Sequence, residues 1–187
     1  YYCRARRTDS RLLVEKTPLN SRYAEQLLAH FPEAKVLFVL RDGRDVCASL
    51  EMRSEHESWP PADRKEQIEL WLEAATAGLQ ILGDPRYAGR AAQIRYEDLI
   101  EDPLAETARL YGFAGIESTS ELVAQAVEQT DFAALQRSDK SGFYRNGIVG
   151  DWRNHFSAED ERLFRQLAGP VFLECGYTLD DASTTQA

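Results

Sequence analysis

Six consecutive residues at positions 35–40, Lys-Val-Leu-Phe-Val-Leu, constrain the fold of this 187-residue chain more than any other segment. Successive side chains of a strand point to opposite faces, so the strand that these residues predict is apolar on both faces. Strands of this kind lie in the middle of parallel sheets, where helices cover them on both sides. The segment therefore predicts a central parallel strand.

The rest of the sequence alternates between strand and helix patterns, which is typical of an α/β fold with a mostly parallel sheet. A second strand is expected over residues 93–96, and the short apolar run at 12–14 also ends at a polar cluster. Capping signals and apolar spacing predict six helices, which start near Pro18, Arg44, Asp63, Pro103, Ser120 and Ser157. The first of them is expected to present an apolar face made of Tyr23, Leu27, Leu28 and Phe31. The last is expected to break near Gly169 and Pro170. We expect one domain over 1–179 and a flexible tail at 180–187.

Composition and charge exclude several classes of protein. The chain has 22 Lys and Arg against 31 Asp and Glu, a net charge of −9, which argues against a nucleic-acid partner. The longest clear apolar run, Val36–Leu40, is far shorter than the ~18 residues that a membrane span needs. The three cysteines and three histidines form no ligand pattern, so we expect no metal site and no disulfide framework. Free thiols favour a cytoplasmic location, while the oligomeric state is not indicated.

The residues after the strand at 35–40 are suited to binding a phosphate group. Ligands bind beyond the carboxyl ends of parallel strands, where Glu15, Arg41 and Tyr96 are all expected. The guanidinium of Arg41 and the hydroxyl of Ser49, one to two turns into the next helix, can converge on one phosphate near the helix N-terminus. The alternative is a set of surface ion pairs between neighbouring charges, which are Arg41, Asp42, Arg44 and Asp45.

A carboxylate and an ammonium lie side by side at Glu15 and Lys16, directly before Thr17 and Pro18. This arrangement suits a base and an anion stabiliser in a group-transfer reaction. The alternative is an ordinary helix start, in which Thr17 is the cap and the two charges are solvated.

The loop at 140–155 is rich in Gly, Asn and Arg, and it contains Arg145. Such a loop can wrap a phosphate with backbone N–H groups and a cation, or it can be a surface loop anchored by Trp152 and Phe156. Tyr96 together with Thr130 and Phe132 suits a purine base, although single aromatic residues also occur in cores.

In their order and spacing these segments resemble the sulfotransferases that use 3′-phosphoadenosine 5′-phosphosulfate (PAPS) as donor. The family has an Arg after its central strand and a Ser eight residues later, as at Arg41 and Ser49. Its other characteristic elements are similar to the segments at 15–18 (Glu-Lys-Thr-Pro), 96–99 (Tyr-Glu-Asp-Leu), 130–132 (Thr-Asp-Phe), 145–147 (Arg-Asn-Gly) and 150–156 (Gly-Asp-Trp-Arg-Asn-His-Phe). Order and spacing together are more specific than any one motif.

The resemblance implies a P-loop NTPase-like parallel sheet flanked by helices. It also implies transfer of a sulfonate from PAPS to a hydroxyl or amine of a small-molecule, carbohydrate or peptide acceptor. The product is then adenosine 3′,5′-bisphosphate, and no metal is needed. Glu15 is the expected general base, and Lys16 is expected to stabilise the leaving group. The expected cofactor-binding residues are Arg41, Ser49, Arg145, Asn146 and Gly147 at the 3′-phosphate, and Tyr96, Thr130 and Phe132 at the adenine.

Two departures from the family pattern accompany the resemblance. Position 146 is Asn where many relatives have Lys, so Arg145 is expected to carry more of the phosphate contact. The family's 5′-phosphosulfate loop, a Pro-Lys-Ser-Gly-Thr-Thr-like turn, has no counterpart in residues 1–10, which contain no glycine. Two other functions stay open at this point: a nucleotide-dependent kinase of related fold, although no Walker-type Gly-x-x-x-x-Gly-Lys is present, and a non-catalytic nucleotide-binding module.

Overall fold

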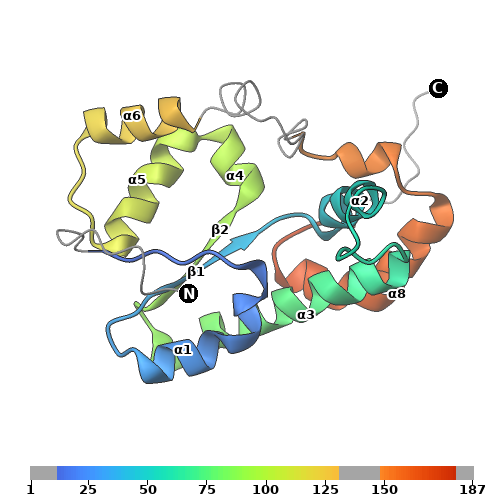
Figure 1. Ribbon diagram of the computed structural model, residues 1–187, viewed down its shortest axis with the longest axis horizontal. Coiled ribbons are helices and arrows are strands. Elements are labelled where there is room, and N and C mark those ends of the chain that lie inside the picture. The colour runs from blue at the N-terminus through green and yellow to red at the C-terminus, as the bar shows by residue number, and fades with distance from the viewer. Residues whose placement is uncertain (1–11, 131–147, 180–187) are drawn as a thin grey trace.

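Two parallel strands with helices packed around them form the described part of the computed structural model, residues 12–130 and 148–179 (Figure 1). Strand β1 (Val36–Leu40) pairs with β2 (Ala91–Arg95) in parallel, with Val36 opposite Ala91 and Leu40 opposite Arg95. The predicted parallel strand and the α/β class are therefore confirmed. Strand β2 ends one residue earlier than predicted, because Tyr96 begins the next helix.

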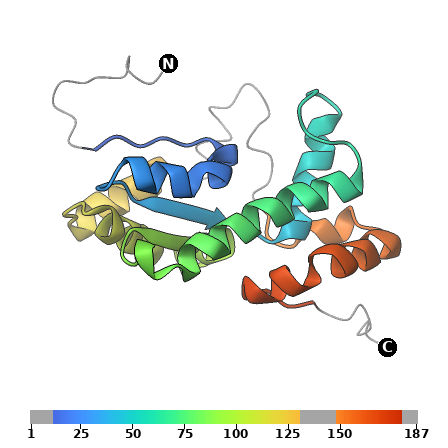
Figure 2. The same cartoon turned by 90° about the horizontal axis from the view of Figure 1, so that it is seen from below.

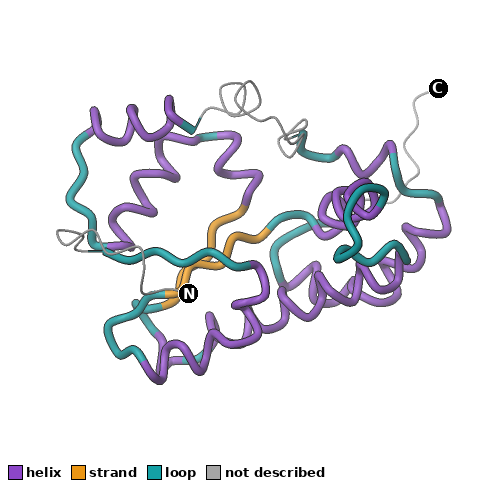
Figure 3. Tube along the Cα trace, in the orientation of Figure 1, coloured by secondary structure: helices purple, strands orange, loops and turns teal. Residues whose placement is uncertain are grey.

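Helices account for most of the described residues (Figure 3). They are α1 (Ala24–His30), α2 (Gly43–Ser54), α3 (Arg64–Gly83), α4 (Tyr96–Glu101), α5 (Pro103–Ala114), α6 (Ser120–Gln129) and α8 (Ala158–Glu174), with 3₁₀ turns at Pro18–Tyr23, Pro85–Tyr87 and Asp151–Asn154. Several begin at a side chain that accepts a hydrogen bond from an N–H of the first turn, which is the usual way to satisfy these donors. These caps are Asp42, Asp63, Asp102, Thr119 and Ser157.

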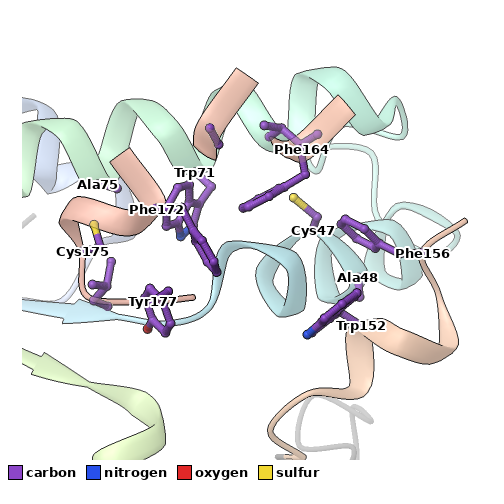
Figure 4. Packing of buried hydrophobic residues seen from close by; sticks show 13 residues of the cluster. Cys47, Ala48, Trp71, Ala75, Trp152, Phe156, Phe164, Phe172, Cys175 and Tyr177 are labelled. Atoms are coloured by element: carbon purple, nitrogen blue, oxygen red, sulfur yellow. The ribbon is translucent and has the colours of Figure 1, made fainter. Parts of the chain in front are cut away.

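The larger hydrophobic core lies between α2, α3 and α8 (Figure 4). Trp71 of α3 packs against Phe164 and Phe172 of α8, and these two phenylalanine rings meet edge to face with centroids 5.2 Å apart. The start of α2 is pressed into this core, since a Cβ on Gly43 would lie 2.7 Å from the Trp71 ring and 2.8 Å from Phe164. Glycine at position 43 thus allows the chain that leaves β1 to enter α2 beside the core.

A smaller core lies between α1, α3 and one face of β1. Ala24 and Leu28 of α1 are buried there with Ile81 and Tyr87, and Val36 and Phe38 of β1 pack against them. The predicted apolar face of the first helix is wrong in part, because Tyr23, Leu27 and Phe31 are exposed. The segment begins as a 3₁₀ turn, whose tighter winding shifts the following residues around the helix axis.

The opposite face of β1 is open in the described part of the chain. Leu37 is 37% exposed and Val39 is 65% exposed, whereas the sequence predicts a strand buried on both faces. Among the described residues β2 is the only strand paired with β1, so one edge of β1 has no neighbour there. Figure 2 shows long helix α3 (green) running from the sheet to the region of α2 and α8, along one side of the strands.

Two further sequence predictions are wrong. The run at 12–14 is exposed and is not a strand, and within the described ranges its backbone pairs with no strand. Helix α8 does not break at Gly169 and Pro170 but continues to Glu174. Phe164 and Ala168 before this point, and Phe172 after it, are all buried in the core, and this packing outweighs the hydrogen bond that Pro170 cannot donate. The predicted domain limits, with a tail at 180–187 outside the described residues, stay a prediction.

Candidate functional site

Two of the predicted site residues, Arg41 and Tyr96, lie together at the carboxyl ends of β1 and β2. Each directly follows its strand, so the parallel pairing carries both to the same edge of the sheet. The guanidinium carbon of Arg41 lies 4.7 Å from the centre of the Tyr96 ring, a cation–π distance. Nη2 of Arg41 donates to the Ile148 carbonyl oxygen at 3.2 Å, and the Trp71 indole N–H donates to the Arg41 carbonyl oxygen at 3.1 Å.

The Nε atom of Arg41 is buried and has no hydrogen-bond partner among the described residues. A buried donor without an acceptor is costly, so most such groups in proteins are paired with protein, water or a ligand. Phosphate oxygens are among the strongest acceptors for a guanidinium group. The chemistry at Arg41 therefore fits a bound phosphate group.

A buried carboxylate, Asp45, connects Arg41 to the segment that follows residue 147. Oδ2 of Asp45 accepts the Gly150 N–H at 2.8 Å and Oδ1 accepts the Trp152 N–H at 2.8 Å, while Arg41 Nη2 lies 3.9 Å from Oδ2. Burial raises the pKa of Asp45 above its usual value, and the two backbone N–H groups and Arg41 act in the opposite direction. Asp45 thus joins the first turn of α2, the turn at Gly150 and the arginine at the end of β1.

Ser49 is half-buried on α2, four residues after Asp45. Residues four apart lie on the same face of an α-helix. Because Asp45 faces the Gly150–Trp152 turn, Ser49 lies on the helix face that is turned toward this segment, one turn farther along α2. This placement is compatible with its predicted role beside Arg41.

A second polar network lies behind these residues. Asp42 and Arg44 form an ion pair with 2.7 Å between Nη2 and Oδ2, and both residues are buried. Glu97 accepts the Asp42 N–H and the Tyr177 hydroxyl, both at 2.8 Å. Burial raises the pKa of Tyr177, and the neighbouring Glu97 carboxylate adds to this shift. Ion pairs between neighbouring charges of this segment, the alternative to phosphate binding, therefore do form, but Asp42, Arg44 and Asp45 are buried rather than at the surface.

This network lines an open cavity of about 400 Å³. Arg95 lies at this cavity with its guanidinium carbon 4.4 Å from the centre of the Tyr177 ring, and its Nε is buried without a hydrogen-bond partner among the described residues. The Nε of Arg95 lies 3.9 Å from Glu97. The cavity holds both carboxylates and arginines, so its charge is mixed.

The two predicted catalytic residues lie on an exposed segment before the first 3₁₀ turn. The Glu15 carboxylate accepts hydrogen bonds from the Thr17 hydroxyl at 2.6 Å and from the Asn20 side-chain amide. Thr17 precedes the 3₁₀ turn but does not cap it with its side chain. Glu15 is not at the end of a strand, contrary to the sequence prediction, because residues 12–14 do not form one. The catalytic roles of Glu15 and Lys16 stay predictions.

The predicted adenine contacts are described only in part. Thr130 is exposed at the end of α6, where its hydroxyl donates to the Ala126 carbonyl oxygen at 2.8 Å. Helix α6 packs on α5, and Figure 1 shows both on the opposite side of β2 from the α2, α3 and α8 core. The structure therefore brings Arg41 and Tyr96 together, and the place of Thr130 beside the adenine stays a prediction. Four predicted residues lie outside the described residues: Phe132, Arg145, Asn146 and Gly147.

The sequence analysis missed Asp45 and Glu97 as parts of the site. The sequence predicts Asp45 only as a member of a surface ion pair, and Glu97 only as part of the Tyr-Glu-Asp-Leu element. A signal for Asp45 does exist, because it lies four residues after Arg41 and four before Ser49. Nothing in the sequence indicates that its partners are the backbone N–H groups of Gly150 and Trp152.

Within residues 12–130 and 148–179, no three His, Cys, Asp or Glu side chains are grouped so that they could hold a metal ion. In the same two ranges, every helix is too short or too polar to cross a membrane.

Comparison with known proteins identifies relatives for most of the chain. The sequence profile of the sulfotransferase family matches residues 1–121. The nodulation protein NoeE of Sinorhizobium fredii is 28% identical over 188 residues, covering 89% of this chain and 45% of its own length. Guinea pig (Cavia porcellus) sulfotransferase 1E1 is 30% identical over 124 residues, covering 56% of this chain and 38% of its own length. The chain thus spans less than half the length of these curated relatives.

Solved structures show the same fold. Mouse sulfotransferase SULT7A1, crystallised with PAP, superposes with a TM-score of 0.64 over 80% of this chain and 64% of its own, at 18% identity. Retinol dehydratase in complex with androsterone and inactive cofactor PAP gives a TM-score of 0.57 over 81% of this chain and 49% of its own, also at 18% identity. The α/β fold is therefore that of these enzymes, which confirms the predicted class. With a family profile that covers well over half of its residues, this chain belongs to the sulfotransferase family.

Proposed function

We propose that this chain takes part in the transfer of a sulfonate group from PAPS to a hydroxyl or amine acceptor, with adenosine 3′,5′-bisphosphate as the product. The observation that carries the proposal is the arrangement of Arg41. Its guanidinium stacks on Tyr96 at the carboxyl ends of two parallel strands, and its buried Nε has no acceptor among the described residues. Family membership supports the same function and does not favour a kinase.

In this proposal Arg41 and Ser49 hold the 3′-phosphate, assisted by Arg145, Asn146 and Gly147. Arg41 supplies a charged fork of donors and Ser49 a hydroxyl from the adjoining helix, which suits an anion with several oxygens. Tyr96, with Thr130 and Phe132, lies beside the adenine. The location of Arg41 and Tyr96 at one sheet edge supports a single nucleotide site that includes both residues.

PAPS supplies the sulfonate group when it is bound, and the chain supplies the proton acceptor and the electrostatic stabilisation. Glu15 accepts the proton of the acceptor hydroxyl or amine as that atom bonds to sulfur. Lys16 neutralises the charge that develops on the phosphate oxygen as its bond to sulfur breaks. Positioning and charge stabilisation carry the reaction, as in phosphoryl transfer.

The acceptor is proposed to be a small molecule, a carbohydrate or a peptide, and a cytoplasmic location is proposed with it. Cys47 and Cys175 are both free thiols, which supports a reducing compartment.

Nucleotide binding tests the cofactor assignment. We expect adenosine 3′,5′-bisphosphate to raise the melting temperature of the chain more than adenosine 5′-phosphate or ATP with Mg²⁺ does, because only the first carries a 3′-phosphate. Arg86→Ala should keep this response to adenosine 3′,5′-bisphosphate, because Arg86 is an exposed arginine that pairs with Asp84 and Glu25. Stabilisation by ATP with Mg²⁺ alone would support the kinase and contradict the proposal.

The proposed base is tested by Glu15→Gln in a polypeptide that also carries a Pro-Lys-Ser-Gly-Thr-Thr-like loop upstream. Glutamine keeps the shape of the side chain but cannot accept the proton, so turnover should fall by ~10²–10⁴-fold while nucleotide binding is kept. Glu33→Gln, at an exposed carboxylate near β1, is the matched control. Near-normal turnover of Glu15→Gln would remove Glu15 from the mechanism, and no turnover in the unsubstituted polypeptide would favour a non-catalytic nucleotide-binding module.

A further inference from the structure

Asp45 is a buried carboxylate that lies in the chain between Arg41 and Ser49, the two described residues of the candidate phosphate site. It is 2% exposed and lies in the first turn of α2, the helix that also carries Ser49. Each of its two oxygens accepts one backbone N–H from the next segment of the site, Gly150 on one oxygen and Trp152 on the other, both at 2.8 Å.

These bonds fix the relative positions of three separate parts of the chain. Asp45 holds the turn at Gly150 against α2. Two residues before Gly150, the carbonyl oxygen of Ile148 accepts a hydrogen bond from Arg41. Asp45 also lies 3.9 Å from Nη2 of the same arginine. A displacement of the turn would therefore move the acceptor that orients the Arg41 guanidinium.

We propose that Asp45 is a positioning residue for nucleotide recognition: it orients Arg41 and the Gly150–Trp152 turn so that the site distinguishes a 3′-phosphate from a phosphate at the neighbouring 2′ position. The inference rests on the proposed function of Arg41 as a phosphate ligand. Asp45 is almost completely buried, so it acts through the groups that it holds and not by contact with the nucleotide.

The negative charge of Asp45 and its hydrogen bonds have opposite effects on phosphate binding. The charged groups around it are Arg41, which favours the ionised carboxylate, and Asp42, which opposes it. A negative charge beside a phosphate site repels a dianion, so removing this charge alone would strengthen the binding of every nucleotide phosphate nearby. Loss of the hydrogen bonds from Asp45 should weaken binding, and this loss should depend on whether the phosphate is attached at the 3′ or the 2′ position.

The test compares adenosine 3′,5′-bisphosphate with adenosine 2′,5′-bisphosphate, which have the same composition and charge. Affinities are measured by calorimetry for the unsubstituted chain and for Asp45→Asn. Asparagine has one acceptor oxygen where aspartate has two, so one of the two N–H groups loses its partner and the turn shifts. We expect the preference for the 3′ isomer to fall by at least about tenfold, since small displacements of positioning groups have effects of this size.

Asp42→Asn is the matched control. Asp42 is a buried aspartate of the same segment, but its partner is Arg44 and not the Gly150–Trp152 turn. We expect this variant to keep the preference for the 3′ isomer even where its melting temperature falls. A structural role common to buried carboxylates would lower the preference in both variants and would overturn the proposal.

A second variant reaches the same turn without changing Asp45. Gly150 has a φ of 84°, a backbone conformation that residues with a Cβ rarely adopt, so Gly150→Ala should displace the N–H that Asp45 accepts. This variant should also lose preference for the 3′ isomer. It keeps the test decisive if Asp45→Asn does not fold.

The outcomes separate the inference from the proposed function. If the unsubstituted chain does not distinguish the two isomers, the 3′-phosphate site itself is wrong. If it does so and both variants keep its preference, or if Asp45→Asn binds both isomers more tightly by the same factor, Asp45 acts only as a nearby charge and the positioning role is refuted.

Discussion

At the scale of single residues, Arg41 and Ser49 give the most direct prediction. Arg41→Ala and Ser49→Ala should each weaken the binding of adenosine 3′,5′-bisphosphate, because each removes a donor to the 3′-phosphate. Hydrogen bonds to charged groups contribute about 1.5–3 kcal/mol, so the loss should be larger for the cationic Arg41 than for Ser49. Calorimetry measures these affinities, and adenosine 5′-phosphate, which has no 3′-phosphate, is the control ligand. Equal losses for both nucleotides would contradict the assignment.

Gly43 leads to a prediction on stability. Gly43→Ala should lower the free energy of unfolding by about 1–3 kcal/mol, because its Cβ would meet the rings of Trp71 and Phe164 within the core. Gly83→Ala is the matched control, at an exposed helical glycine with no atom within 4 Å of the added Cβ. That change should stabilise the chain by about 0.5–1 kcal/mol. Urea denaturation of both variants measures the difference, and a stable Gly43→Ala would show that the core yields at this point.

Sequence alone could place Arg41 and Tyr96 together, because both follow strands and parallel strands end at one edge. It could not place Asp45, since the partners of this carboxylate are backbone groups more than a hundred residues away. Backbone N–H groups are the same at every position and leave no trace in the sequence. The surroundings of Glu15 were wrongly predicted for a related reason: an apolar run becomes a strand only where another strand is present to pair with it.

At the scale of elements, α8 shows how packing overrides a local signal. Its start was correctly predicted from Ser157 and Asp160, which form a reciprocal capping box. The predicted break at Pro170 is absent, because the buried rings of Phe164 and Phe172 on either side of this residue keep the helix continuous. Capping bonds lie within four residues and can be predicted from sequence, whereas the contacts that keep α8 continuous come from α2 and α3.

This helix allows two opposite substitutions to be compared. Pro170→Ala should raise the free energy of unfolding by roughly 1–3 kcal/mol, because Pro170 is exposed and lacks the N–H of a regular helix. Ser157→Ala should lower it by about 1 kcal/mol through loss of the cap. Urea midpoints measure both effects. A destabilised Pro170→Ala would mean that the proline shapes α8 in a way the core requires.

At the scale of the whole molecule, the buried thiols predict a loss of stability in alkaline solution. Burial raises the pKa of Cys47 to about 12 and that of Cys175 to about 11, from an ordinary value of 9.0. Above about pH 9 the unfolded chain therefore releases protons that the folded chain keeps, so the free energy of unfolding decreases as the pH rises. The raised pKa of Tyr177 acts in the same direction.

Urea denaturation at pH 7.5, 9 and 10 measures this decrease. The double variant Cys47→Ala with Cys175→Ala should begin with a lower stability, because Cys47 is fully buried, but should lose less of it between pH 7.5 and 10. An identical slope for both proteins would show that the thiols do not contribute.

The open side of β1 has a consequence for how this chain behaves in concentrated solution. A strand with an unpaired edge presents a row of N–H and C=O groups on which another extended chain can assemble, and apolar side chains next to that edge strengthen the contact. Among the described residues β1 has such an edge, and its Leu37 and Val39 are exposed, as are the apolar residues at 12–14. The strand that determines the fold is therefore also the site from which we expect self-association to begin, and its extent should rise with protein concentration.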